Sequence, residues 1–393
     1  MFYPRKILPA LEKELSTKEI IIITGTRQVG KTTLLTHLFS QIASSNKILL
    51  DLENPLHRKI FEEENFDNIW INLEQFGVSK KQKSYIFLDE VQYLPQISQA
   101  VKYLYDHWQV KFFLTGSSSF YLKNLFPESL TGRKMIFELF PLTFAEFLTF
   151  KNIKREIPVR LAEKARRKNK IAYEQCIKYY QEYLNFGGFP KVVLEENHER
   201  KKKLLEEIFK SYFEKDVRNL AGFKNISKLR DLILLLVPRV ASKIEISKLS
   251  SELSLTRETV YNYLSFLEQT YFISLLPKFS RSLDRLASGG KKLFFCDTGL
   301  ANFLGKASLG QLLENSVFQN LHPDHKLHFY SKSGESEIDF IVDERTALEV
   351  KLSSARKDIT SLKKKSRTLK LKEAYLVSLN YEEEKGVILV TDL

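Results

Sequence analysis

The sequence predicts an α/β fold, in which a parallel sheet is followed by a helical segment and a second, smaller α/β part. Ile20–Ile23 is an unbroken β-branched run that leads into a glycine-rich turn and then into helical periodicity, as in a buried parallel strand. Near the C-terminus, Glu337–Val342 and Thr346–Leu352 alternate polar and apolar residues around a short turn, which is typical of a hairpin. The 393 residues suffice for several folding units. We expect domains at 1–150, 151–225, 226–283 and 284–393.

Composition narrows the class of partner. The chain has 61 Lys and Arg against 48 Asp and Glu, a net charge of +13, which favours a polyanion such as nucleic acid or an anionic membrane surface. Cys176 and Cys296 are too few for a disulfide framework, which indicates a reducing compartment. The longest apolar runs, Ile20–Ile23 and Leu232–Val237, are far shorter than the roughly 20 residues that cross a bilayer. We therefore expect a soluble, cytoplasmic protein without a membrane partner.

The turn after the first strand carries the most specific motif. Gly25–Thr32 matches GxxxxGK(S/T) and lies between a strand and a helix, a setting in which backbone N–H groups and the helix dipole face a phosphate. Lys31 would reach the β- and γ-phosphates, and the Thr32 hydroxyl would bind Mg²⁺. The motif predicts ATP and Mg²⁺ as cofactors, bound by Gly25, Thr26, Arg27, Gln28, Val29, Gly30, Lys31, Thr32 and Thr33.

Two further strands are expected beside this loop. Ser84–Glu90 is an apolar run that ends in two carboxylates. Asp89 would hold Mg²⁺ through water, and Glu90 would act as the general base on the attacking water. Lys111–Thr115 runs into three serines, one of whose hydroxyls could lie between the loop and Asp89; the serine is left open, with Ser117 favoured.

Lys47–Asp51 and Met135–Leu139 complete a five-stranded parallel sheet. Arg133, just before the last strand, has two interpretations. It could act as an arginine finger or sensor, or it could form a structural salt bridge.

The middle of the chain is helical. Arg160–Lys170 is strongly basic and is either a solvated helical face or a nucleic-acid contact. Leu249 and Leu253, then a turn at Leu255-Thr256, then Val260, Leu264 and Leu267, have helix-turn-helix spacing, followed by a wing strand at Tyr271–Leu276. Thr256 would cap the second helix, with Arg257, Thr259, Tyr261 and Asn262 among its early positions. Winged helices of this kind bind DNA in some proteins and join domains in others.

The C-terminal hairpin predicts a second site. A three-residue loop at Asp343–Arg345 places Val342 opposite Thr346, and therefore Asp339 opposite Glu349, with Lys351 on the same face. A two-residue loop would shift the register and separate them. Paired carboxylates favour a hard divalent metal, and an adjacent lysine can orient or deprotonate water. The alternative is an exposed hairpin whose charges are merely solvated.

This spacing, with Glu314 on an expected helix Gly310–Leu321, resembles the PD-(D/E)XK nuclease superfamily. The resemblance implies metal binding by Glu314, Asp339 and Glu349 and a catalytic role for Lys351. Arg356–Lys372, with eight basic residues and one acid, would extend a phosphate-contacting surface there.

In its whole order the chain resembles AAA+/STAND-related ATPases of prokaryotes with a C-terminal domain of unknown function. That resemblance implies an additional-strand sheet of order 5-1-4-3-2, a sensor-1 hydroxyl near Ser117 and catalytic roles for Glu90 and Arg133. Two functions follow. In one, ATP turnover controls a DNA-binding or DNA-cutting tail; in the other, a nucleotide-dependent switch docks a protein partner. A homo-oligomer is expected if Arg133 acts in trans.

Overall fold

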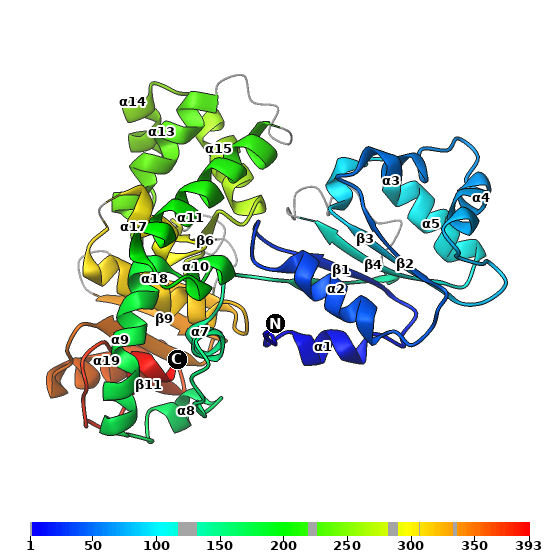
Figure 1. Ribbon diagram of the computed structural model, residues 1–393. Helices are drawn as coiled ribbons and strands as arrows, with labels where there is room; N and C mark the ends of the chain where they lie inside the picture. The colour runs from blue at the N-terminus through cyan, green and yellow to red at the C-terminus, as the bar shows by residue number, and fades with distance from the viewer. Residues whose placement is uncertain (1, 117–131, 219–225, 282–289, 306, 333–335) are drawn as a thin grey trace. The chain divides into compact units, whose positions relative to one another are not determined.

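The computed structural model describes residues 2–116, 132–218, 226–281, 290–305, 307–332 and 336–393. The chain forms two compact units (Figure 1). Unit 1 comprises residues 1–140 with 269–271, and unit 2 comprises 141–268 with 272–393. The predicted division of unit 2 into three domains remains a prediction.

Unit 1 is built on a five-stranded parallel sheet, drawn in blue and cyan in Figure 1. Its order is β2-β3-β4-β1-β5, which is the 5-1-4-3-2 order that the resemblance implies. Every residue of β1 and β4 is buried, as expected for central parallel strands. The strands are β1 Ile20–Thr24, β2 Lys47–Asp51, β3 Ser84–Asp89, β4 Val110–Gly116 and β5 Lys134–Glu138.

Helices cover this sheet. Phe39 of α2 packs edge-on against Phe87, which stacks on Phe113, so α2 covers one face. Trp70 and Leu104, from α4 and α5, belong to the core that includes the other side chains of β3 and β4. The helices are α1 Leu8–Lys13, α2 Lys31–Gln41, α3 Pro55–Lys59, α4 Asn68–Gln75 and α5 Ile97–His107, with a 3₁₀ turn η1 at Val91–Tyr93. Because all strands are parallel, their carboxyl ends meet at one edge, where the glycine-rich loop lies.

Unit 2 begins with packed helices. Its centre is an aromatic cluster of Phe144, Tyr180 and Tyr183 with ring centroids 4.8 to 6.0 Å apart. Gly187 and Gly188 follow α9, and a Cβ on Gly187 would lie 1.9 Å from a carboxylate oxygen of Asp297. The helices are α7 Phe144–Phe150, α8 Leu161–Lys164, α9 Lys170–Phe186, α10 Pro190–Leu194, α11 His198–Ser211 and the π-helical η3 Tyr212–Val217.

Three helices and a hairpin follow. α13 Ile226–Leu236 leads through a 3₁₀ turn, η4 Val237–Arg239, to α14 Ile246–Leu253 and α15 Arg257–Gln269. The Thr256 hydroxyl accepts from the Thr259 amide at 3.1 Å, so the predicted N-cap is confirmed. β6 Ile273–Leu276 pairs antiparallel with β7 Lys292–Phe295, a strand that the sequence analysis does not predict.

The C-terminal part of unit 2 holds a mixed five-stranded sheet of order β12-β11-β10-β9-β8. β8, β9 and β10 are antiparallel, and β10, β11 and β12 are parallel. Ile359 and Leu362 of α19 pack on the sheet core. The elements are α17 Thr298–Leu304, α18 Leu309–Leu321, β8 Leu327–Lys332, β9 Ser336–Val342, β10 Thr346–Lys351, α19 Arg356–Thr368, β11 Glu373–Ser378, β12 Val387–Leu389 and the 3₁₀ turn η5 Val390–Asp392.

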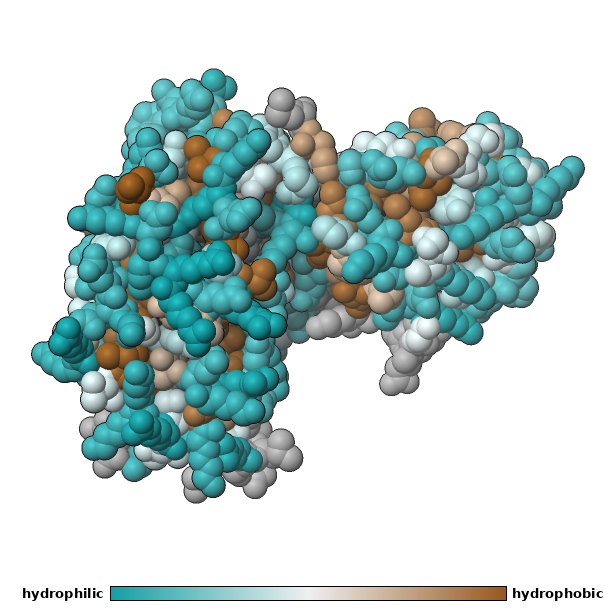
Figure 2. Space-filling view, turned by 90° about the horizontal axis from the view of Figure 1, so that it is seen from below, coloured by the Kyte–Doolittle hydropathy of each residue, from teal (hydrophilic) through white to brown (hydrophobic). Residues whose placement is uncertain are grey.

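The part of the chain that the structure describes contains no helix that is both long and apolar enough to span a bilayer. In the view of Figure 2, hydrophilic residues cover most of the surface of unit 2, and hydrophobic residues appear as small spots.

Candidate functional site

The loop after β1 requires glycine. Gly25 has a φ of +145°, and a Cβ there would lie 1.9 Å from the carbonyl oxygen of Leu139. Gly30, with a φ of +99°, is the N-cap of α2, and the space around its Cα is open. The loop therefore ends at the backbone N–H groups that begin α2, a position that favours anions.

Lys31 lies inside this loop. It is only 4% exposed, and its ammonium donates hydrogen bonds to the carbonyl oxygens of Gly25 at 3.0 Å and Thr26 at 2.8 Å. Carbonyl oxygens stabilise a positive charge without neutralising it. Of the other predicted loop residues, Thr26, Arg27 and Val29 are buried, Gln28 and Gly30 are half-buried, and Thr32 and Thr33 are exposed.

Asp89 lies at the carboxyl end of β3, beside this loop. It is 4% exposed, and burial raises the pKa of its carboxyl, while hydrogen bonds from the Thr115 and Thr32 hydroxyls oppose that rise. A desolvated carboxylate gains from a nearby cation. The Thr24 hydroxyl oxygen, directly before the loop, is buried and has no hydrogen-bond partner among the described residues. The oxygen donors here fit Mg²⁺ together with a phosphate ligand, which would supply further oxygens.

The hydroxyl next to Asp89 belongs to Thr115. Its Oγ1 donates to Asp89 Oδ1 and accepts from the backbone N–H of Glu90, the latter at 3.0 Å. The residue that the sequence favours, Ser117, lies outside the described residues. The sequence pattern points to a hydroxyl after the strand, whereas Thr115 lies within β4, and for that reason Thr115 was missed.

Glu90 follows β3 with a left-handed backbone, at a φ of +55°. Its carboxylate accepts a hydrogen bond from the side-chain amide of Gln92 in η1. The residue therefore departs from the strand direction immediately after Asp89. Its role as the general base remains a prediction.

Arg133 lies at the other edge of the same sheet. The Arg133 carbonyl accepts a hydrogen bond from the amide of Ile20, which is the first residue of β1. The glycine-rich loop follows the last residue of β1, at the opposite end of the strand. With five residues in β1, the two edges are roughly 15 Å apart. The guanidinium pairs with both carboxylate oxygens of Asp106, at 2.6 and 2.7 Å. The geometry therefore shows the salt bridge that was one of the two interpretations of Arg133. It does not fit a sensor role within the same subunit. A role in a neighbouring subunit remains a prediction.

In unit 2, the hairpin has the predicted register. Thr346 pairs with Val342 and Leu348 with Phe340, and this ladder ends one residue before Asp339 and Glu349. The Val350 amide donates to Asp339 Oδ2 at 2.8 Å. The predicted three-residue loop therefore sets this pairing.

A lysine that the sequence analysis does not predict lies between the carboxylates. The Lys292 ammonium, on β7, is 2.5 Å from Glu314, 3.3 Å from Glu337 and 3.5 Å from Asp339. Its side chain is 3% exposed. Burial raises the pKa of Glu314 to about 8, and the charge of Asp339 adds to the rise, while Lys292 opposes it. Burial also raises the pKa of Asp339, and Lys292 again opposes the rise.

Glu349 has separate partners. One carboxylate oxygen lies 2.9 Å from the Lys351 ammonium and the other 3.4 Å from Lys365 of α19. The predicted ligands Glu314, Asp339 and Glu349 are thus divided between two sets of lysines. Within the described ranges, no three or more His, Cys, Asp or Glu side chains are grouped so as to hold a metal. This arrangement does not fit a divalent metal, because an ammonium already lies among the carboxylates.

Lys292 and Lys365 could not be found by local spacing. Lys292 comes from an unexpected strand and meets residues 22 and 47 positions further along the chain. The one available signal was a charged residue opening the apolar run Leu293–Phe295, which is unusual for a buried strand.

Sequence comparison places three domain families along the chain. Residues 17–148 match the AAA domain, residues 177–311 a domain of unknown function (DUF8612), and residues 309–391 another domain of unknown function (DUF4143).

Relatives match nearly the whole chain. An uncharacterised protein of Methanocaldococcus jannaschii, MJ1544, is 30% identical over 395 residues, covering 95% of this chain and 85% of the relative. An uncharacterised protein of Haemophilus influenzae is 29% identical over 338 residues, and the alignment covers 83% of this chain and 80% of that protein. Among solved structures, a Walker-type ATPase of Pyrococcus abyssi aligns with a TM-score of 0.47 and 14% identity, covering 77% of this chain and 96% of that one. The chain belongs to the same family as MJ1544, and its N-terminal part is an AAA-type P-loop ATPase domain.

Proposed function

We propose that the chain binds and hydrolyses ATP with Mg²⁺, and that this turnover controls a nucleic-acid-binding tail in unit 2. The observation that carries the first half is the convergence of Lys31, Thr32 and Asp89 at one edge of the sheet. A buried cation and a buried carboxylate at the end of parallel strands are the parts that phosphoryl transfer needs.

Each residue has a distinct role. Lys31 binds the β- and γ-phosphates, and Thr32 and Asp89 hold Mg²⁺, which neutralises charge on the phosphate oxygens. Glu90 takes a proton from the attacking water. Thr115 is a positioning residue, since its hydroxyl contacts both Asp89 and the amide of Glu90.

The order of elements in the tail supports the proposal of a winged helix. α13, α14 and α15 precede the β6–β7 hairpin, and the early side chains of α15 include exposed Arg257, Tyr261 and Asn262. A cation, a planar ring and an amide are side chains that contact phosphates and bases. We propose that α15 contacts DNA, since a strongly basic chain favours a polyanion.

A second function is favoured by Lys292. Because its ammonium already balances Glu314 and Asp339, the nuclease-like arrangement would not need a metal and would not cut. In that case the tail binds nucleic acid, or docks a protein partner, without cleavage. The PD-(D/E)XK assignment and its catalytic Lys351 remain predictions.

The test begins with the purified full chain. We expect phosphate release from ATP that requires Mg²⁺, and loss of nucleotide binding in Lys31→Ala. His37→Ala, on the same helix but beyond the loop, is the matched control. Absence of hydrolysis in the presence of Mg²⁺ and DNA, together with unchanged nucleotide binding by Lys31→Ala, would contradict the assignment. Incubating the protein with supercoiled and linear DNA and Mg²⁺ or Mn²⁺ distinguishes a tail that cleaves DNA from one that does not. Cleavage that disappears in Lys351→Ala would restore the nuclease interpretation.

A further inference from the structure

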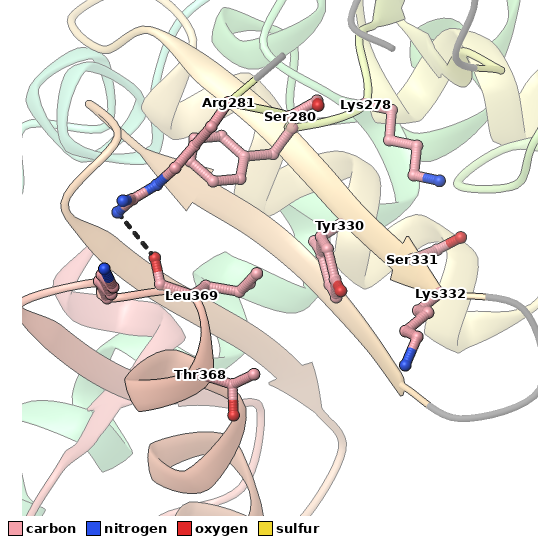
Figure 3. Close-up of a pocket in the computed structure, with 10 residues that line it drawn as sticks. Lys278, Ser280, Arg281, Tyr330, Ser331, Lys332, Thr368 and Leu369 are labelled. Carbon is pink, nitrogen blue, oxygen red and sulfur yellow. Dashed lines mark hydrogen bonds between the residues drawn. The ribbon is translucent and has the colours of Figure 1, made fainter.

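Unit 2 contains a pocket of about 570 Å³ that lies outside both sites described above (Figure 3). Three segments line it: residues 278–281 after β6, residues 330–332 on β8, and residues 368–370 at the end of α19. Phe279, Tyr330 and Leu369 also pack on the core of the C-terminal sheet, so the apolar floor is fixed.

The lining is basic. Lys278, Arg281, Lys332 and Lys370 line it, and no Asp or Glu of the described residues does. Arg281 donates to the carbonyl oxygen of Leu369 at 3.0 Å, which holds its guanidinium at the rim, as the dashed line in Figure 3 shows. No carboxylate of the described residues forms an ion pair with Lys278, Arg281 or Lys370. In contrast, Lys292, Lys351 and Lys365 each have such a partner.

Hydroxyl groups complete the lining. Ser280, Ser331, Thr368 and Tyr330 bring hydroxyl groups to the lining. Ser331 accepts a hydrogen bond from the ammonium of Lys243, and Thr368 donates one to the carbonyl oxygen of Lys364 at 3.1 Å. Positive charge combined with short hydroxyl side chains is the combination that binds phosphate oxygens.

The basic surface continues away from the pocket along α19. Lys363, Lys364 and Arg367 are exposed, and none has an ion-pair partner within the described ranges. Lys363 and Arg367 are four residues apart, about 6 Å along the helix, so their side chains follow one another on one face. A free phosphate would need only the pocket, whereas a row of unpaired cations leading from it suits a strand with repeated charges.

We propose that this pocket binds a phosphate group of a nucleic-acid strand, whose neighbouring phosphates contact α19. The inference rests on the proposed nucleic-acid-binding tail and names the surface that does the binding. The half-buried ring of Tyr330 lies on the pocket wall, where it can stack on the sugar or base attached to that phosphate.

The experiment measures the fluorescence anisotropy of a labelled DNA oligonucleotide, single-stranded and duplex, against the full chain at low and at physiological NaCl concentration. Lys278→Glu/Arg281→Glu is the main variant. Lys370→Gln is a milder one that leaves the Arg281 contact with Leu369 intact. Lys178→Glu/Lys203→Glu, which changes exposed lysines of α9 and α11, matches the charge change. Circular-dichroism melting establishes that each variant is folded.

We expect the main variant to bind at least about tenfold more weakly than the matched control. Its slope of log affinity against log salt should be smaller by about one unit for each phosphate that it no longer neutralises. Lys370→Gln should weaken binding about threefold. If the main variant and the control have equal DNA affinity and equal salt dependence, the proposal that the pocket binds a phosphate is overturned. DNA binding by another part of the tail would still stand.

Two further outcomes separate this inference from the proposed function. If the parent hydrolyses ATP but binds neither single-stranded nor duplex DNA, the proposed phosphate pocket and the proposed nucleic-acid-binding role of the tail are both wrong. The ATPase assignment would still stand. If the chain instead sediments with phosphatidylglycerol vesicles and this depends on Lys278 and Arg281, the pocket recognises a membrane surface and the nucleic-acid proposal is overturned.

Discussion

The nucleotide site of unit 1 and the carboxylate cluster of unit 2 contain the same kinds of residue in opposite arrangements. In unit 1, Lys31 donates to the backbone carbonyls of Gly25 and Thr26, and Asp89 accepts from the hydroxyl of Thr115. In unit 2, Lys292 lies directly on Glu314 and Asp339. We therefore expect a metal at Asp89 and none among Glu314, Asp339 and Glu349.

The largest expected effect is on turnover. Glu90→Gln should keep ATP binding and lower kcat by about 10² to 10⁴-fold, because the amide cannot accept the proton of the attacking water. Asp51→Asn, at the end of the neighbouring strand opposite Asp89, is the matched control and should slow turnover far less. Single-turnover phosphate release measures both. Equal rates in Glu90→Gln and the parent would remove Glu90 as the base.

The second expected effect concerns the cluster itself. Lys292→Met leaves Glu314 and Asp339 buried without their cation, and breaking a buried pair in this way costs about 3–5 kcal/mol of unfolding free energy. Lys292→Met/Glu314→Leu should recover much of that loss. Thermal melts of both variants measure it.

The neighbouring Lys291, whose side chain is 52% exposed, provides the control variant Lys291→Met. Mn²⁺ should raise the Tm of Lys292→Met but not that of the parent, since only the variant lacks the ammonium. A Lys292→Met protein as stable as Lys291→Met would show that the ammonium does not balance the carboxylates.

Asp297 extends the contrast, because its hydrogen-bond partners among the described residues are amide N–H groups and not an ammonium. Asp297 is fully buried, caps α17 through the Leu300 amide and accepts from Gly188 and Gln319. Burial raises its pKa from 3.8 to about 6, against the opposing effect of these N–H donors.

The folded state therefore binds this proton more tightly than the unfolded state does. The contribution of Asp297 to stability is greatest below the unfolded pKa and falls by about 3 kcal/mol as pH rises from about 4 to 6. Urea unfolding of the parent and of Asp297→Asn, measured at both ends of this range, should show a larger fall in the parent, because the other buried acids with raised pKa values are present in both proteins. Identical pH dependence in the two proteins would contradict the raised pKa.

The smallest expected effect is at Thr115. Thr115→Val removes a hydroxyl that bonds to a charged group, which is worth about 1.5 kcal/mol, so kcat should fall about tenfold with nucleotide affinity little changed. Thr115→Ser should restore the rate, because it returns the hydroxyl. A Thr115→Val protein with parental kcat would mean that this hydrogen bond does not position Asp89.

The two regions also differ in how far the sequence could predict them. The strands of the parallel sheet, the loop at Gly25–Thr32 and the start of the hairpin register follow from short segments, in which a strand period or a turn length sets the geometry. The strand order of the sheet came from the family resemblance and not from any local pattern. Lys292 does not, because it meets its carboxylates through tertiary packing of β7. Thr115 was not predicted because the sequence pattern placed the hydroxyl on a serine after the strand, whereas Thr115 lies within β4.

The most direct test of this contrast counts metal ions. Mn²⁺ is titrated into the full chain with a non-hydrolysable ATP analogue, and into Asp89→Ala and Asp339→Ala. We expect one tightly bound Mn²⁺ per parent chain, lost in Asp89→Ala and kept in Asp339→Ala. Two Mn²⁺ in the parent with one lost in Asp339→Ala, or one that survives Asp89→Ala, would contradict the assignment of a metal to unit 1 and an internal lysine to unit 2.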